Sequence, residues 1–150
     1  MTGRRERVAA VRSIVAVTRE FEQAARGAEM SLAQYRLLLF LADGPRRAGE
    51  LAALQLVTKG TISPQLASLR DRGWVEDRPD GDRRVSRLAL TAAGRAQMNR
   101  FEGLLDQCLA QLLQTDEADD GAASIYAGLQ ALYVALGRTR ETRFDALWRS

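Results

Sequence analysis

With 150 residues, of which 46% are hydrophobic, the chain is long enough for one domain or one compact two-lobed unit with a packed core. It holds one cysteine and no histidine, which excludes an internal disulfide and removes the commonest general base and metal ligand. No apolar run approaches the roughly 20 residues of a membrane span, and arginines interrupt residues 1–30. We therefore expect a cytoplasmic protein without a signal peptide or membrane contact.

The net charge of +3 is unevenly distributed along the chain. Residues 46–95 carry a net charge of +4, whereas residues 96–137 carry −5. A block of like charge is usually a solvated face. On a compact helix-turn-helix segment, however, a basic block favours a polyanionic partner.

The first predicted helix covers residues 5–26, where apolar side chains recur at helical spacing, and it ends at Gly27. Ser31 and Gln34 have the spacing of a capping box, in which each side chain bonds the backbone amide of the other. A second helix is expected from there through Leu41.

Two further helices are predicted in the basic block, a short one at 48–55 and a longer one at 58–72. We expect Thr58 to be the N-cap of the longer helix. Gly73 is expected to end this helix as a C-cap residue in the left-handed backbone conformation. The inward face of this helix carries apolar residues at i, i+4 and i+7, namely Ile62, Leu66 and Leu69.

Residues 74–90 alternate as two strands around a turn at 79–82 and predict a β-hairpin. Thr91 is expected to cap a long helix. Its apolar stripe consists of Met98, Phe101, Leu104, Leu105, Cys108, Leu109, Leu112 and Leu113. An acidic loop at 115–121, a final helix around 125–136 and a basic tail at 138–150 follow. The spacing of Phe144, Leu147 and Trp148 in this tail would suit one more helical turn.

This order predicts a mainly α fold with a small two-stranded β-wing, forming a single unit over residues 1–150. The winged helix-turn-helix lobe is expected at 46–91. The helical lobe is expected at 1–30 and 95–150, and its apolar stripes exceed what a small winged helix can bury. Soluble monomers avoid large apolar patches, so we expect these helices to join two copies in a homodimer.

The helix at 58–72 has the properties of a DNA-recognition helix. A major groove about 12 Å wide admits one helix, which a second helix must hold across the backbone. The outward face carries side chains suited to bases and phosphates, namely Thr58, Lys59, Thr61, Ser63, Gln65 and Ser68. Taken alone, such a face is equally typical of any soluble helix.

The hairpin tip adds weight to a double-stranded DNA partner. Arg83 and Arg84 are adjacent on a turn, and a narrow minor groove attracts inserted arginines. Asp82 could hold the Arg84 guanidinium through charge-assisted hydrogen bonds. The alternative is an ordinary surface hairpin with a salt bridge.

Four stretches of the sequence, residues 50–54, 58–63, 69–75 and 82–94, resemble the winged helix of the multiple antibiotic resistance regulator (MarR) family. The last is the most specific, because an Asp-x-Arg wing tip leads into a Leu-Thr-x-x-Gly helix start. The resemblance implies a homodimeric transcription regulator, in many members a repressor. It also implies release from DNA by a small aromatic or phenolic effector bound between the lobes, while other members sense oxidants through cysteine.

Two residues depart from the family pattern. Pro64 stands in the recognition helix, where proline removes an amide and clashes with the carbonyl of Gly60. Either this helix starts near Thr61 or it is kinked, and a kink would pass the role of Gln65 to Thr61 or Ser63. The second departure is Cys108, which lies on the apolar stripe and is expected to be a buried, inert thiol.

Two alternative functions are an enzyme and a winged helix that contacts only proteins. An enzyme would need a nucleophile with a base, or a metal cluster, and we expect no catalytic, metal or cofactor site. The acidic residues Asp116, Glu117, Asp119 and Asp120 lack the alternating spacing of a calcium loop. A winged helix used only for protein–protein contact is the main alternative, and the paired wing arginines argue against it.

An effector pocket would lie between the two lobes. Residues that could line it between the lobes are Phe21, Tyr35, Leu38, Phe40 and Phe101. Aromatic and apolar residues at helical spacing more often belong to a hydrophobic core, so a core and a pocket are both possible for these residues.

Overall fold

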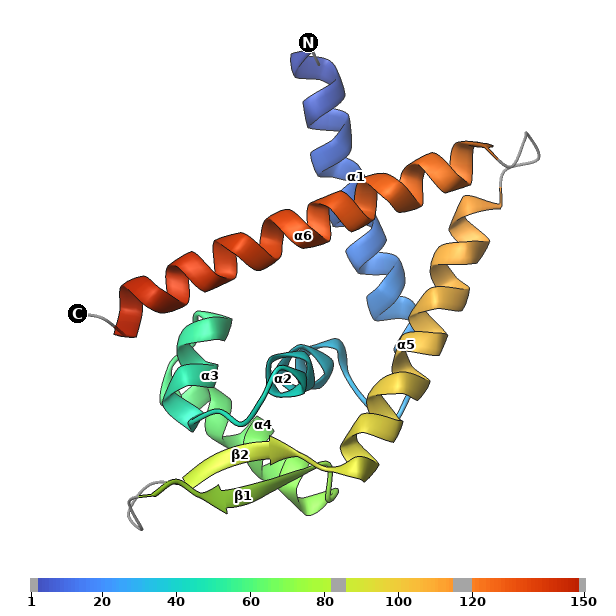
Figure 1. Ribbon diagram of the computed structural model, residues 1–150. Coiled ribbons are helices and arrows are strands. Elements are labelled where there is room, and N and C mark those ends of the chain that lie inside the picture. Colours follow the sequence, from blue (N-terminus) through green and yellow to red (C-terminus); the bar gives the residue numbers. More distant parts are fainter. Residues whose placement is uncertain (1–2, 82–85, 115–119, 149–150) are drawn as a thin grey trace.

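The computed structural model describes residues 3–81, 86–114 and 120–148 (Figure 1). In chain order the elements are α1 (Arg4–Ala24), α2 (Leu32–Ala42), α3 (Ala48–Gln55), α4 (Lys59–Asp71), β1 (Val75–Pro79), β2 (Ser86–Leu90), α5 (Ala92–Leu113) and α6 (Asp120–Trp148). The strands pair antiparallel, with Val75 opposite Leu90 and Pro79 opposite Ser86. The predicted fold class, mainly α with a two-stranded β-wing, is confirmed.

Local hydrogen bonds place the helix starts as the sequence predicts. The Ser31 hydroxyl accepts from the Gln34 amide at 3.2 Å, and the Gln34 side chain accepts from the Ser31 amide at 3.0 Å. The Thr58 hydroxyl accepts from the Thr61 amide at 3.2 Å. The Thr91 hydroxyl accepts from the Gly94 amide at 3.0 Å. Each cap satisfies an amide that the first helical turn would otherwise leave unpaired.

Pro64 lies inside α4 and not in its first turn. The helix begins at Lys59, so the expectation that it starts near Thr61 is wrong. Thr58 is a sufficient cap for a start at Lys59. The missing amide of Pro64 deprives the Gly60 carbonyl of its usual donor, but both residues are exposed and water can supply one. The Ser63 hydroxyl donates to the Lys59 carbonyl at 2.7 Å on the same turn.

The core lies beneath the winged helix, between α2, α3, α4 and β2. Its most completely buried large side chains are Met30, Leu37, Leu38, Leu51, Ile62, Leu66, Leu69 and Leu88. The first part of α5 extends this core through Met98, Phe101 and Leu105. Further along α5 burial decreases, and Cys108 is half-buried, so the expectation of a buried thiol is wrong.

The helices α1, α5 and α6 extend from this body (Figure 1). Helix α1 contacts α5, and α6 returns to contact α3. Helix α6 is continuous from Asp120 to Trp148, so the acidic loop ends before residue 120, and the basic tail predicted from residue 138 continues α6 as a helix up to Trp148. Gly137 does not interrupt α6, because a glycine weakens a helix by only about 1 kcal/mol. In the described part of the chain, no helix is both long and apolar enough to cross a membrane.

Leu56 connects α3 to α4 in a left-handed conformation, with φ 56° and ψ 40°. Its side chain is 75% exposed, so it gains little from burial. The left-handed region costs a branched residue roughly 1–2 kcal/mol, and asparagine tolerates it better. We expect Leu56→Asn to raise the free energy of unfolding by about 0.5–1 kcal/mol, measured by urea denaturation. Gln55→Asn, at a right-handed helical position, should be neutral or destabilising, and a loss of stability in Leu56→Asn would contradict the strain argument.

Candidate nucleic-acid interface

The polar face of α4 divides into an exposed part and a part turned toward the body. Thr58, Lys59, Thr61 and Ser63 are exposed at the start of the helix. The Thr58 and Thr61 hydroxyl oxygens lie 2.9 Å apart and share a hydrogen bond. Small hydroxyls and an ammonium group at an exposed helix start are suited to phosphates and base edges.

Gln65 and Ser68 are half-buried, and their surroundings differ from those of the first turns of α4. The Gln34 side-chain amide of α2 donates to the Ser68 hydroxyl at 3.2 Å. The Oε1 atom of Gln65 is enclosed and has no hydrogen-bond partner among the described residues. Ser68 therefore links α4 to α2, and Gln65 must turn outward before its oxygen can meet a base.

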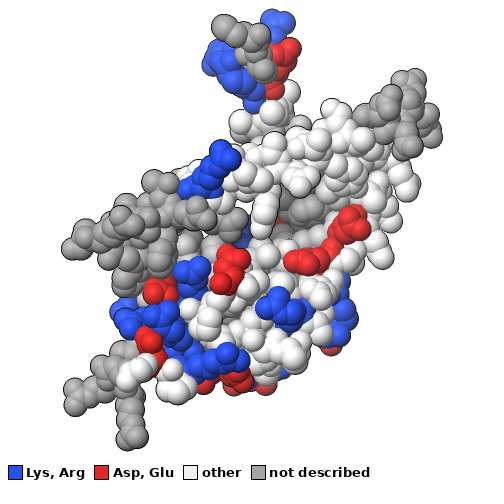
Figure 2. All heavy atoms as spheres, viewed as in Figure 1, with Lys and Arg blue, Asp and Glu red and all other residues white. Residues whose placement is uncertain are grey.

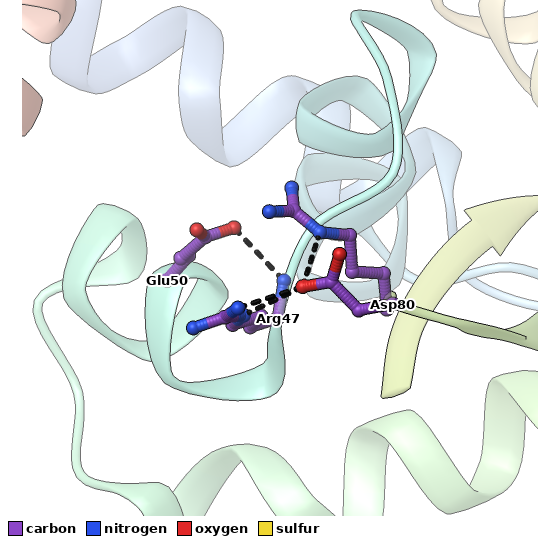
Figure 3. A network of polar contacts seen from close by, with 4 residues as sticks. Arg47, Glu50 and Asp80 are labelled. Carbon is purple, nitrogen blue, oxygen red and sulfur yellow. Dashed lines mark hydrogen bonds and ion pairs between the residues drawn. The ribbon is translucent and has the colours of Figure 1, made fainter. Parts of the chain in front are cut away.

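The hairpin is joined to the segment between α2 and α3. The Arg46 amide donates to the Leu88 carbonyl at 2.9 Å, and the Leu88 amide donates back at 2.7 Å. Next to this bridge, Asp80 Oδ2 lies 2.7 Å from Arg47 Nη2 and 2.9 Å from Arg87 Nε. Figure 3 shows the Asp80 carboxylate facing the Arg47 guanidinium. The hydrogen bond from Arg47, and to a smaller extent the one from Arg87, holds the pKa of Asp80 below its usual value.

A second ion pair joins the hairpin to the end of α4. Arg70 donates two hydrogen bonds to Asp77, from Nε at 2.6 Å and from Nη2 at 3.0 Å. The Ser86 hydroxyl also donates to Asp77, at 3.2 Å. The hydrogen bond with Asp77 raises the pKa of Arg70, and the same bond lowers the pKa of Asp77. Such bidentate pairs constrain geometry as well as charge, so the base of the wing is oriented relative to α4.

The ion pairs that join the hairpin to the helices were not predicted from the sequence. The charge count over residues 46–95 did not assign any cation to an acidic partner. Opposite charges at facing positions of a hairpin are a signal for such pairs, but Asp80 and Arg47 are 33 positions apart. Figure 2 shows Lys and Arg gathered with acidic side chains over the winged helix, whereas the described surface of α6 is almost uncharged in this view. The predicted wing-tip residues Asp82, Arg83 and Arg84 lie outside the described residues.

A cavity of about 400 Å³ opens between α1, α2 and α5. It is lined by Thr18, Phe21, Leu32, Tyr35, Arg36, Leu39, Glu102, Leu105, Asp106 and Leu109. Phe21 and Tyr35 were predicted for such a pocket. Leu38 and Phe101 do not line it, because they are 0% and 3% exposed within the core, and Phe40 packs against the core as well.

Tyr35 is the most constrained polar group of this cavity. Its hydroxyl donates to Glu102 Oε1 at 2.9 Å. Its ring lies 5.3 Å from the Phe101 ring, at an angle of 46°. Burial, followed by the hydrogen bond to Glu102, raises the pKa of the Tyr35 phenol well above its ordinary value. The phenol therefore stays neutral and protonated throughout the physiological pH range.

A helix pair with an exposed polar second helix, followed by a two-stranded wing tied to both, defines the winged-helix class of transcription regulators. Residues 28–85 match the model of the MarR family. Over these residues, which include the helix pair and the first strand of the wing, the chain is similar to the MarR family, and the resemblance predicted from the sequence is confirmed. No curated protein matches the chain in sequence.

Solved structures agree with this fold over most of the chain. A MarR family protein from Bacillus stearothermophilus is 18% identical, with a TM-score of 0.72, covering 91% of this chain and 99% of that one. A transcriptional regulator from Thermotoga maritima is 25% identical, with a TM-score of 0.66, covering 87% and 94%. The transcriptional repressor CouR, bound to a 23-mer DNA duplex, is 24% identical, with a TM-score of 0.62, covering 83% and 89%.

Proposed function

We propose that this chain is a homodimeric repressor that binds double-stranded DNA at an inverted-repeat operator and is released by a small aromatic effector. The observation that carries the proposal is the exposed polar start of α4, held beside a wing that Asp80 and Asp77 tie to the body. The solved complex of CouR with a DNA duplex supports this use of the fold.

The homodimer is supported by the apolar side chains of α1 and α6. No residue of α1 is buried. The exposed apolar residues of these two helices include Val8, Val11, Val15, Ile125, Leu129, Leu132, Tyr133 and Leu136. We assign residues 46–91 to DNA binding, and residues 1–30 and 95–150 to dimerisation.

A footprint on genomic DNA tests the operator directly. Two recognition helices related by a two-fold axis should protect two half-sites whose centres are about one helical turn, roughly 10 base pairs, apart. An asymmetric single half-site would contradict the homodimer as the binding species. Transcription from the neighbouring promoter, with and without the protein, then separates a repressor from an activator.

Two serines of α4 offer a matched test of base contact. Ser63 is exposed and its hydroxyl bonds within α4, to the Lys59 carbonyl, whereas Ser68 is half-buried and bonded to Gln34 of α2. We expect Ser63→Ala to weaken operator binding by about 1–3 kcal/mol and to leave binding to random duplex nearly unchanged, because base contacts carry sequence information. Ser68→Ala should leave the ratio of the two affinities unchanged. Fluorescence anisotropy on both duplexes measures this, and equal losses in both variants would contradict the assignment.

The wing arginines are proposed to contact the minor groove and the phosphate backbone. Arg84→Ala should weaken binding to operator and random duplex alike, and should flatten the salt dependence by about one unit per protomer. Asp82→Ala should have the same effect more weakly. The measurement is the slope of log affinity against log salt concentration. A variant that changed only sequence preference would show that Arg84 reads bases instead.

The same salt series separates DNA binding from the alternative, a winged helix that contacts only proteins. A DNA-binding protein must lose affinity for random duplex steeply between low and moderate salt. Its Lys and Arg side chains displace counterions from the phosphates, and this release is less favourable at higher salt concentration. Absence of any duplex binding at low salt would favour the protein-contact alternative.

A further inference from the structure

The wall of the cavity between α1, α2 and α5 carries more negative than positive charge. Its charged lining residues are Glu102 and Asp106 from α5 and Arg36 from α2. We propose that the effector of this cavity is an aromatic cation, and not an aromatic carboxylate. This inference rests on the effector release proposed above and assigns the chemical class of the effector.

Burial decides which charge of the wall dominates. Glu102 is half-buried, whereas Arg36 and Asp106 are exposed. A charge shielded from water acts more strongly on a bound molecule than an exposed charge, which water and salt screen. The least hydrated charge at the cavity is therefore a carboxylate, and the exposed Asp106 adds a second carboxylate to the lining.

Tyr35 does not offer its proton to an anion. Its hydroxyl already donates to Glu102 at 2.9 Å, so a bound carboxylate would have to break that bond to obtain a donor. A carboxylate such as that of Glu102, by contrast, has about four lone-pair positions, and the bond from Tyr35 occupies one. An ammonium group can bind the remaining positions while the Tyr35 bond stays in place.

The rest of the wall suits an aromatic ring. Half of the ten lining residues are apolar, namely Phe21, Leu32, Leu39, Leu105 and Leu109, and the volume of about 400 Å³ lies within the usual range of small-molecule sites. Phe21 and Tyr35 also place aromatic rings in the lining, and an aromatic ring attracts a cation that lies over its face. The neighbouring group on α6 that acts electrostatically on Tyr35 is the phenol Tyr133, which contributes no competing positive charge.

Three probes of nearly equal size test the charge preference. These are 2-naphthylmethylammonium, 2-naphthylmethanol and 2-naphthoate, titrated into the full chain by calorimetry. We expect the cation to bind at least about tenfold more tightly than the anion, with the alcohol between them. Equal or tighter binding of 2-naphthoate, or no binding of any probe, would overturn the proposal.

Neutral variants locate the preference. Asp106→Asn and Glu102→Gln should each reduce the cation-to-anion affinity ratio several-fold, while the affinity for 2-naphthylmethanol stays within about twofold. Asp106 is exposed, so its replacement should fold even if Glu102→Gln does not. Asp43→Asn, at the far end of α2 and outside the cavity, is the matched control and should leave the ratio unchanged. An unchanged ratio in both cavity variants would overturn the proposal.

Operator release is measured separately with the same cation. Binding with the expected preference, together with loss of the operator complex, supports both proposals. Binding with the expected preference but without loss of the complex upholds the charge assignment of the cavity and contradicts effector release. The two failures are therefore distinguishable.

Discussion

Replacing Gly94 with alanine is expected to destabilise the protein by about 3 kcal/mol, because the new methyl group has no space. A Cβ atom at this position would lie 2.0 Å from the Trp74 carbonyl oxygen and 2.8 Å from Leu90 Cδ1. The Trp74 oxygen cannot easily move, since it accepts the Thr91 amide at 3.1 Å. The gain of about 1 kcal/mol from the higher helix propensity of alanine does not offset this clash.

Gly103→Ala is the matched control on the same helix. Nothing lies within 4 Å of a Cβ at Gly103, so this variant should gain about 0.5–1 kcal/mol from helix propensity. Both variants are compared by urea unfolding at one protomer concentration, because dimer stability depends on concentration. Equal stability of Gly94→Ala and the unsubstituted protein would show that α5 can shift away from the hairpin at little cost.

Leu129→Glu is expected to convert the proposed dimer to a monomer. Leu129 is 39% exposed and lies in the middle of the apolar stripe of α6. A two-fold interface contains each substitution twice, and each copy would bury an unpaired carboxylate in place of a leucine. We expect the dimer dissociation constant to rise by at least about 10³-fold. Sedimentation at micromolar concentration should then report a mass near 16.6 kDa in place of twice that value.

Ala127→Glu is the control for this prediction. Ala127 is also exposed on α6 and lies on the side of the helix opposite the stripe. It should therefore leave the dimer intact and keep operator binding. A Leu129→Glu variant that still sediments as a dimer would place the interface on another surface. If both variants were monomeric, added charge on α6, and not loss of the stripe, would be the cause.

Local chemistry explains why much of the fold could be predicted from the sequence. Ser31, Thr58 and Thr91 each have their cap partner three residues along the chain, and a bond over three residues forms largely irrespective of the rest of the fold. The same holds for the 3.6-residue spacing that buries Ile62, Leu66 and Leu69. The order of helices and hairpin, and with it the winged-helix class, follows from such short-range patterns.

The motif Leu-Thr-x-x-Gly depends on both local and long-range contacts. The Thr91 hydroxyl accepts the Gly94 amide within the helix start, and it donates to the Gly73 carbonyl at 2.7 Å across the hairpin. The cap was predictable from spacing alone. The requirement for glycine at position 94 was not, because it comes from the Trp74 carbonyl, 20 positions earlier in the chain.

Contacts between distant residues decided the remaining features of the site. The pairing of Asp80 with Arg47, the bond from Gln34 to Ser68 and the cavity beside Glu102 each involve residues that are remote in the chain and meet only in the folded protein. Leu38 and Phe101 were predicted for the cavity because they are apolar or aromatic residues at helical spacing. In the folded protein they are buried in the core instead. The sequence by itself determined which helices form and which faces are apolar. Tertiary structure decided which polar groups remain free for a ligand, because burial and partnership depend on neighbours that are remote in the chain.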